Sequence, residues 1–218
     1  MTTASDAFTG GTPGASITGA NWSSYREAPG GFNQWVYATG GESVEPDTDA
    51  SSLGVRYIGS TFSNDQYSKV TLASAGTGSG WSFYVGVTAR CSGSTTTAHC
   101  YQFNWSPNQW DITRLVNNTG TVLGAVIGGP ANLAIGDRMR IEVTDSGTVS
   151  TIEGFYNEVS VGSRTYDHAG GTLASGAPGF EAYNSGATFG KVESWEGGDL
   201  GSAQSQAPRS MHQFALRR

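Results

Sequence analysis

FYVGVTAR at residues 83–90 and YQFNWS at residues 101–106 decide the fold of this chain. In both stretches apolar and polar side chains alternate, so that Val85 and Val87 share one face while Asn104 falls on the polar face of its own stretch. Alternation with a period of two is typical of a β-strand that buries one side. The two stretches therefore predict neighbouring strands, each with one buried face.

The same alternation recurs on both sides of this pair. No apolar series with helical spacing continues for three turns, and clusters of Gly, Asn, Asp and Ser separate the alternating runs. Short strands with frequent turns predict an all-β sandwich or barrel. The further expected strands are residues 53–58, 138–144, 149–156, 159–161 and 187–195.

Composition agrees with this fold and narrows the partners. A chain of 218 residues fits one large β-sandwich, and 6 Trp, 9 Tyr and 9 Phe supply bulky packing beside 32 Gly. Charged residues make up only 14%, with a net charge of −6, which disfavours nucleic acid as a partner of the folded body. We expect no signal peptide and no membrane-spanning segment, because no charged and apolar leader and no long apolar run is present.

The chain divides into a sandwich domain at residues 1–198 and a C-terminal segment at residues 199–218. Residues 199–218 hold one acid and three arginines, a net charge of +2, which leaves −8 on the domain. The segment begins with a flexible linker by composition. Its end mixes cations with apolar anchors, which predicts either an arm that orders on a neighbouring subunit or a frayed terminus. The residues of the expected assembly arm are Arg209, Met211, Phe214, Leu216, Arg217 and Arg218.

The order of short motifs along residues 5–196 resembles the concanavalin A-like lectin/glucanase (laminin G-like) superfamily. The resemblance implies a jelly-roll sandwich of two antiparallel sheets, followed here by an extended C-terminal tail. It says less about activity, since this fold hosts lectins, hydrolases, lyases and structural modules. The motifs are Asp6-x-Phe8 with Trp22, Tyr84-Val-Gly-Val, Tyr101-x-Phe103-x-Trp105, Arg138-x-Arg140-Ile-Glu142-Val, and Gly176-x-Pro178-Gly179.

Cys91 and Cys100 flank a short loop between the two central strands, and we predict a disulfide between them. Their positions in the alternation place the two thiols on opposite faces, so a bulge must intervene for the bond to form. The alternative is two unpaired thiols. A disulfide without a signal peptide would fit a protein made in the host cytoplasm and released into oxidising surroundings, as virions are.

Catalytic motifs of the superfamily are incomplete in this chain. The resemblance to retaining glucanases implies Glu-x-Asp-x-x-Glu on one strand, but Glu153 and Glu158 have Phe155 where the Asp should stand. Arg140-Ile-Glu142 matches one strand of alginate lyases without the Gln-x-His partner. We therefore expect surface acids on an ordinary strand and no enzyme activity.

Two candidate binding sites remain. Aromatic side chains in turn-rich stretches are a candidate carbohydrate platform, with core packing as the alternative. Asp47 and Asp49 are a candidate calcium site, with a solvated loop as the alternative, and no other cofactor is expected. The candidate carbohydrate-binding residues are Trp35, Tyr37, Trp81 and Trp110.

The overall pattern resembles lectin-like structural proteins of tailed bacteriophages. We therefore expect a non-catalytic virion protein, a capsid decoration or head/tail surface protein, that forms homo-oligomers and contacts other virion proteins through its C-terminal arm. Its lectin-like domain would bind a cell-surface glycan. The alternative is a polysaccharide-active enzyme, a glycoside hydrolase or lyase, or a free lectin.

Overall fold

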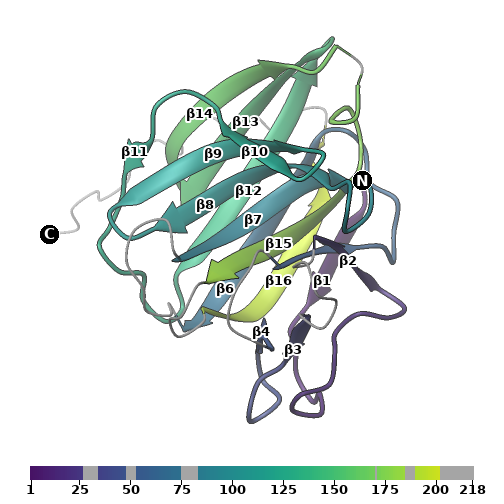
Figure 1. The fold of residues 1–218 in the computed structure, drawn as a ribbon, viewed down its shortest axis with the longest axis vertical. Helices are drawn as coiled ribbons and strands as arrows, with labels where there is room; N and C mark the ends of the chain where they lie inside the picture. Colours follow the sequence, from purple (N-terminus) through teal and green to yellow (C-terminus); the bar gives the residue numbers. More distant parts are fainter. Residues whose placement is uncertain (27–33, 48–52, 75–82, 170, 185–189, 202–218) are drawn as a thin grey trace, which may run out of the picture.

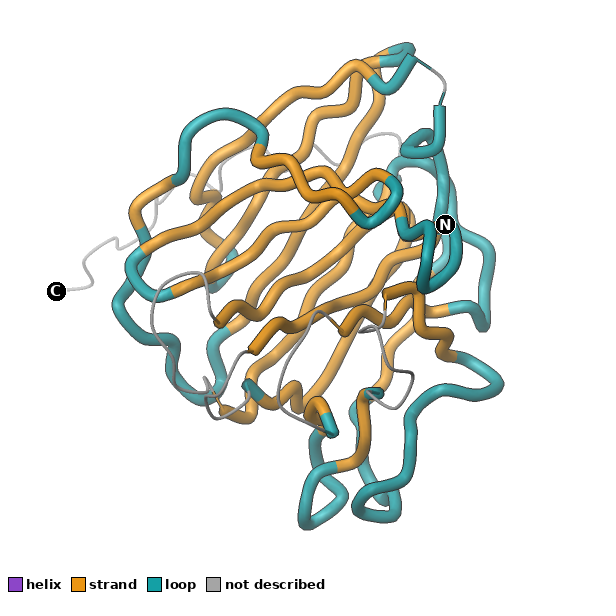
Figure 2. Tube along the Cα trace, viewed as in Figure 1, coloured by secondary structure: helices purple, strands orange, loops and turns teal. Residues whose placement is uncertain are grey.

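The computed structural model describes residues 1–26, 34–47, 53–74, 83–169, 171–184 and 190–201. Two antiparallel sheets of eight strands each lie face to face (Figure 1). Strands joined by loops account for the described part of the chain, which contains no helix (Figure 2). The predicted all-β jelly-roll sandwich is therefore confirmed.

The back sheet lies farther from the viewer in Figure 1. It contains the strands that the sequence predicts at residues 138–144 and 149–156. The register is antiparallel throughout, and β1 adds to the sheet by pairing with β16. Its strands in spatial order are β14 (Val159–Asp167), β13 (Val149–Tyr156), β12 (Arg138–Ser146), β6 (Gln66–Ser74), β16 (Lys191–Asp199), β4 (Val44–Pro46) and β3 (Trp35–Tyr37), with β1 (Thr3–Asp6) beside β16.

The front sheet contains the two stretches that decide the fold, now seen as β7 and β8. A late strand, β15, lies between β7 and the early strand β5, so segments far apart in the sequence become neighbours (Figure 1). Its strands in spatial order are β10 (Thr119–Val122), β9 (Gln109–Val116), β8 (His99–Ser106), β7 (Phe83–Ser92), β15 (Ala177–Asn184), β5 (Leu53–Tyr57) and β2 (Trp22–Arg26), with β11 (Ile127–Gly128) paired to β9.

The hydrophobic core fills the space between the sheets. Val85 and Val87 of β7 face it, as the alternation predicts, and Ile141 of β12 faces it from the back sheet. Trp22 joins the two layers at one end, since its ring centroid lies 5.2 Å from that of Phe180 and 4.8 Å from that of Trp195 in β16. Edge-to-face aromatic contacts of this kind stabilise the core beyond the area that they bury.

A β-bulge at Arg90 interrupts the register between β7 and β8. Arg90 has φ 55°, in the left-handed region that non-glycine residues seldom adopt. Its guanidinium is fully buried between the sheets, where it pairs with Asp145 at 2.8 Å and donates to Ser150 Oγ at 2.9 Å. The bulge also brings Cys91 to the outer face of the sheet, in one cluster with Cys100.

The end of the chain differs from the expected boundaries in detail. The last strand runs over Lys191–Asp199, whereas the alternation predicts residues 187–195, of which 187–189 lie outside the described residues. Residues 202–218, which include the expected assembly arm, also lie outside them. Among the described residues no helix is long and apolar enough to cross a membrane.

Candidate functional site

The outer face of the front sheet, which points away from the core, is polar and nevertheless buried. All eight residues of β8 are buried, including the outward-facing Gln102, Asn104 and Ser106. The alternation predicts one buried face for this strand, and the structure buries both. Buried polar side chains require hydrogen-bond partners, so this face is a candidate site.

Register places polar side chains in a row across neighbouring strands of this face. Gly86 of β7 pairs with Asn104 of β8 on one side and with Glu181 of β15 on the other, and Asn104 pairs in turn with Asp111 of β9. A Cβ atom on Gly86 would lie 2.0 Å from Asn104 Oδ1, so the amide occupies the space above the glycine. We call Gln102, Asn104, Asp111 and Glu181 the polar floor.

Asp111 is an acid without a cationic partner among the described residues. Its Oδ1 accepts hydrogen bonds from Thr113 Oγ1 at 2.6 Å and from Asn104 Nδ2 at 3.2 Å, and the residue is 1% exposed. Burial raises the pKa of Asp111, and these two hydrogen bonds counteract the rise. The carboxylate is therefore held by neutral groups alone.

Glu181 is the second acid of the polar floor and is fully buried. Tyr25 donates its hydroxyl proton to Glu181 Oε2 at 3.1 Å, and Arg26 Nη1 lies 3.4 Å from the same oxygen. Burial raises the pKa of Glu181, Arg26 and Tyr25 lower it, and the negative charge of Asp111 raises it again. The two carboxylates therefore lie within electrostatic reach of each other.

Each member of the polar floor has one atom without a hydrogen-bond partner in the part of the chain that the structure describes. Leaving such an atom unpaired in a buried position costs about 1–3 kcal/mol. Ser106 Oγ on the same face of β8 is a further such atom. A group of them is uncommon in a native structure and marks the polar floor as a candidate place for partners from outside the chain. The atoms of the polar floor are Gln102 Nε2, Asn104 Oδ1, Asp111 Oδ2 and Glu181 Oε1.

Two half-buried tyrosines border the polar floor. The rings of Tyr84 in β7 and Tyr183 in β15 are stacked, with centroids 5.5 Å apart and an interplanar angle of 18°. Arg26 donates to the Tyr84 hydroxyl at 3.0 Å and so links this pair to Glu181. The site thus combines an aromatic rim with polar groups below it, a common arrangement for small-molecule sites.

The two cysteines lie on this same outer face and are free thiols in the structure, so the expected disulfide stays a prediction. The bulge at Arg90 does turn Cys91 to the side of Cys100, as a bond would require. Cys91 Sγ donates to Thr88 Oγ1 at 3.0 Å, Cys100 Sγ donates to the Tyr25 hydroxyl at 3.7 Å, and the two thiols also form a hydrogen bond with each other. Burial raises the pKa of Cys100 well above its usual value.

The structure corrects two of the four expected carbohydrate-binding aromatics. Trp35 is 0% exposed and donates from Nε1 to the carbonyl oxygen of Leu53 at 3.2 Å, while Trp110 is 2% exposed and stacks on Phe103 at 5.0 Å. Both are core residues because their strands turn them inward. Tyr37 is half-buried in β3 of the back sheet, and Trp81 lies outside the described residues.

The expected calcium ligands are only partly described. Asp47 Oδ1 accepts the backbone N–H of Gln34 at 2.8 Å, and Asp49 lies outside the described residues. Within the described ranges, no group of three or more His, Cys, Asp or Glu side chains could hold a metal ion. Calcium at Asp47 therefore stays a prediction from sequence.

The acids of the incomplete glucanase motif lie on the outer face of the back sheet. Glu158 has φ 67° in the turn after β13 and pairs with Arg138 at 3.6 Å and Arg140 at 3.7 Å. Glu153 accepts a hydrogen bond from Ser160. Both are surface acids, as expected, and Arg140 also pairs with Glu142 at 3.0 Å.

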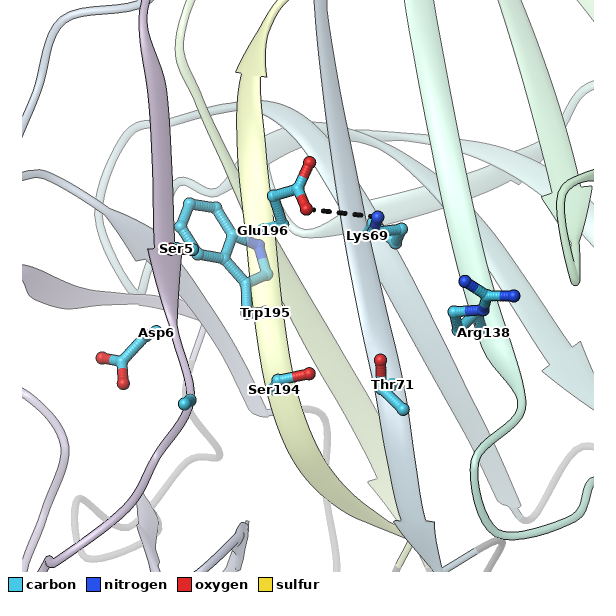
Figure 3. A pocket seen from close by; sticks show the side chains of 9 residues that line it. Ser5, Asp6, Lys69, Thr71, Arg138, Ser194, Trp195 and Glu196 are labelled. Carbon is cyan, nitrogen blue, oxygen red and sulfur yellow. Dashed lines mark ion pairs between the residues drawn. The ribbon is translucent and has the colours of Figure 1, made fainter.

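A shallow hollow of about 260 Å³ lies on the same outer face of the back sheet (Figure 3). Hydroxyl side chains of Ser194 and Thr71 form its floor, and Lys69 pairs with Glu196 at 3.2 Å beside them. This acid and this base neutralise each other. The polar floor of the front sheet, with its unpartnered atoms, is therefore the stronger candidate.

Neither a family model nor a curated protein matches the sequence. Solved structures do match the fold. An endo-1,3-β-glucanase from Streptomyces sioyaensis aligns with a TM-score of 0.56 at 10% identity, over 90% of this chain and 95% of that one. A carbohydrate-binding module, CBM66, from Bacillus subtilis aligns with a TM-score of 0.52 at 12% identity, over 79% and 94%.

A legume lectin-like domain from Entamoeba histolytica gives a similar result, with a TM-score of 0.53 at 12% identity, over 83% of this chain and 91% of that one. Likeness at such low identity shows the fold alone. The class that the fold defines is the concanavalin A-like jelly-roll sandwich, as the sequence motifs predict.

Sequence reasoning missed the polar floor. Glu181 follows Phe180 directly after Gly176-x-Pro178-Gly179, so alternation alone would have placed it on the face opposite the core. Asp111 sits between Trp110 and Ile112 in the same way. The available signal is an acid directly between apolar residues, Trp110 and Ile112 for Asp111, and Phe180 and Ala182 for Glu181. The pairing of β15 with β7 has no signal in the sequence.

Proposed function

We propose that the protein is a lectin-like domain that binds carbohydrate on the outer face of the front sheet. The observation that carries the proposal is the set of four unpartnered hydrogen-bonding atoms on the polar floor. Sugar hydroxyl groups both donate and accept hydrogen bonds, so a sugar ring supplies what Asn104, Asp111 and Glu181 lack. A bound sugar would remove the cost of these unpaired groups.

The aromatic rim supports the same proposal. Tyr84 and Tyr183 present stacked rings beside Glu181, and an aromatic face packs well against the apolar C–H face of a sugar. The solved structures with the same fold include a carbohydrate-binding module and a lectin-like domain, which is consistent with such a role for this fold.

The test is a glycan array followed by isothermal titration calorimetry with the best ligand. We expect Asn104→Ala to weaken binding at least about tenfold, because charged or buried hydrogen bonds contribute about 1–3 kcal/mol. Thr144→Ala, on the exposed outer face of the back sheet, is the matched control and should bind as the parent does. Equal affinity of the Asn104 variant and the parent would contradict the proposal.

A second candidate function is a glycoside hydrolase, and the two acids favour it. Burial raises the pKa of both Asp111 and Glu181, and acids with perturbed pKa values cluster at functional sites. A reducing-sugar assay separates the candidates. Turnover that is lost in Glu181→Gln and Asp111→Asn while binding persists would indicate an enzyme, and binding without turnover in the parent would indicate a lectin.

The expected setting of this domain, a bacteriophage virion with a host surface glycan as ligand, rests on the sequence alone. We propose it as the biological context of the binding site. Mass spectrometry of purified particles should find the protein among the virion components. Its absence from particles, with carbohydrate binding intact, would leave a free lectin.

A further inference from the structure

The hollow on the outer face of the back sheet is lined by neighbouring strands, with β6 between β16 and β12 (Figure 3). Thr71 of β6 has two register partners in the hollow, Ser194 of β16 on one side and Arg138 of β12 on the other. Side chains directly opposite each other on adjacent antiparallel strands have Cβ atoms about 4.5–5.5 Å apart. One small group above Thr71 can therefore contact all three side chains at once.

The two acids that line the hollow already have a donor at each carboxylate oxygen. Glu196 accepts a hydrogen bond from the Tyr67 hydroxyl and pairs with Lys69 at 3.2 Å. Although burial raises the pKa of Glu196, these partners lower it below the usual value. Asp6 accepts a backbone N–H at 2.9 Å on one oxygen and an indole N–H at 3.0 Å on the other. The acids therefore leave few acceptors for a ligand.

The donors of the hollow have capacity to spare. The hydroxyl groups of Ser194 and Thr71 have no side-chain partner within the described ranges. Arg138 has five N–H donors but one ion-pair partner there, Glu158 at 3.6 Å, which Arg140 shares at 3.7 Å. Long ion pairs between exposed side chains contribute little to stability. The guanidinium of Arg138 can therefore donate to a ligand in the hollow.

Spare donors beside occupied acceptors favour a ligand that brings oxygen acceptors. A sulfate or phosphate ester presents three such oxygens in three directions, whereas a carboxylate presents two in one plane. In the hollow, two hydroxyl groups lie on the floor and a guanidinium lies at one side, so the donors also come from more than one direction.

We propose that the hollow binds a sulfate or phosphate monoester, held above Thr71 by the hydroxyl groups of Thr71 and Ser194 and by the guanidinium of Arg138. Charge-assisted hydrogen bonds from an arginine to such a group are stronger than neutral ones. The net charge of −8 on residues 1–198 disfavours an anion at long range, so the ligand gains only from these short contacts. The site lies on the other sheet from the polar floor and is independent of the carbohydrate binding proposed there.

The test is an NMR titration of the ¹⁵N-labelled protein at pH 7 with four compounds that share one ring: glucose 6-sulfate, glucose 6-phosphate, glucuronate and glucose. We expect the amide signals of Thr71 and Ser194 to shift, and the esters to bind there at least about fivefold more tightly than glucose or glucuronate. Whichever ester binds more tightly is the group that the hollow selects. Shifts confined to β8 and β15, or glucose or glucuronate bound at Thr71 as tightly as the esters, would overturn the inference.

Two variants test the named contacts. Arg138→Gln removes the cation, and Thr71→Val keeps the branched shape while removing the hydroxyl; each should weaken ester binding at least about fivefold. The controls lie on the same sheet outside the hollow: Lys191→Gln removes one positive charge from β16, and Thr144→Val removes an exposed hydroxyl from β12. If a control weakens ester binding as much as its partner variant does, the effect is not specific to the hollow and the inference is wrong.

Discussion

Glu181 is a fully buried acid, and keeping a charge in the interior is costly unless it is paired. Tyr25 and Arg26 satisfy one of its oxygens, and the other has no partner among the described residues. If the residue at this position had only a structural role, a neutral glutamine would serve at a lower free-energy cost of burial than a glutamate. Costly buried acids with raised pKa values cluster at functional sites, which is why Glu181 is central to the proposed site.

A substitution at Trp35 tests whether this side chain packs in the core or stacks on a sugar. The side chain is 0% exposed and its ring packs against Phe180 at 4.7 Å, so Trp35→Ala should lower the free energy of unfolding by about 3–5 kcal/mol. Urea denaturation followed by circular dichroism measures this loss. Tyr37→Ala, at a half-buried position of the same strand, should cost less. Unchanged stability with weaker sugar binding would restore Trp35 as a platform residue.

Asp199 makes stability depend on pH. Its carboxylate accepts the backbone N–H of Thr2 at 2.7 Å and of Ser63 at 2.6 Å, and although burial raises the pKa of Asp199, these hydrogen bonds lower it below the usual value. A lowered pKa in the folded state stabilises the protein above the unfolded-state pKa of about 3.9, and this gain is lost as the pH falls through the folded-state pKa.

Asp199→Asn should therefore unfold at a lower urea concentration than the parent at pH 7, and the difference should shrink toward pH 3 as the parent becomes protonated. Glu193→Gln, an exposed acid on the same strand, is the control and should leave the urea midpoint nearly unchanged. A difference between Asp199→Asn and the parent that is constant with pH would show that hydrogen-bond geometry, and not charge, is what Asp199 contributes.

At the scale of elements, alternation predicts strands well where they are long. The runs around Val85, Phe103 and Ile141 became β7, β8 and β12, because one apolar face of each had to be buried. Strands of two to four residues, such as β11, are too short to show a period. The bulge at Arg90 was predictable only as a requirement for a disulfide, since an arginine in the left-handed region has no sequence signature.

Gly86 tests how β7 shapes the site. A Cβ atom there would lie 2.0 Å from Asn104 Oδ1, so Gly86→Ala should displace the amide and weaken carbohydrate binding at least about tenfold, by loss of a buried hydrogen bond. Calorimetric titration measures the affinity, and circular dichroism confirms the fold. Gly128→Ala, where a Cβ would meet nothing within 4 Å, is the matched control. If Gly86→Ala binds carbohydrate as tightly as the parent does, Asn104 is not part of the binding site.

At the scale of the whole molecule, the order of motifs was enough for the fold but not for the site. Asp111 and Glu181 belong to distant parts of the chain and lie on one face of one sheet because β15 inserts between β7 and β5, a pairing that no local pattern encodes. Alternation also cannot tell whether a polar face meets water. It therefore left Gln102 and Asn104 as ordinary surface residues, whereas the structure buries them.

Assembly is the last property to test on the whole chain. Residues 199–218 carry a net charge of +2 against −8 on residues 1–198, so an arm could be attracted to the acidic body of a second copy. We expect light scattering to give the mass of a dimer or trimer for the full chain and of a monomer after deletion of residues 207–218. Higher salt should weaken the assembly, because screening reduces attraction between exposed charges. Replacing Met211, Phe214 and Leu216 with serine keeps the charge and tests the apolar anchors separately. A full chain that is monomeric at low salt would contradict the expected role of the arm.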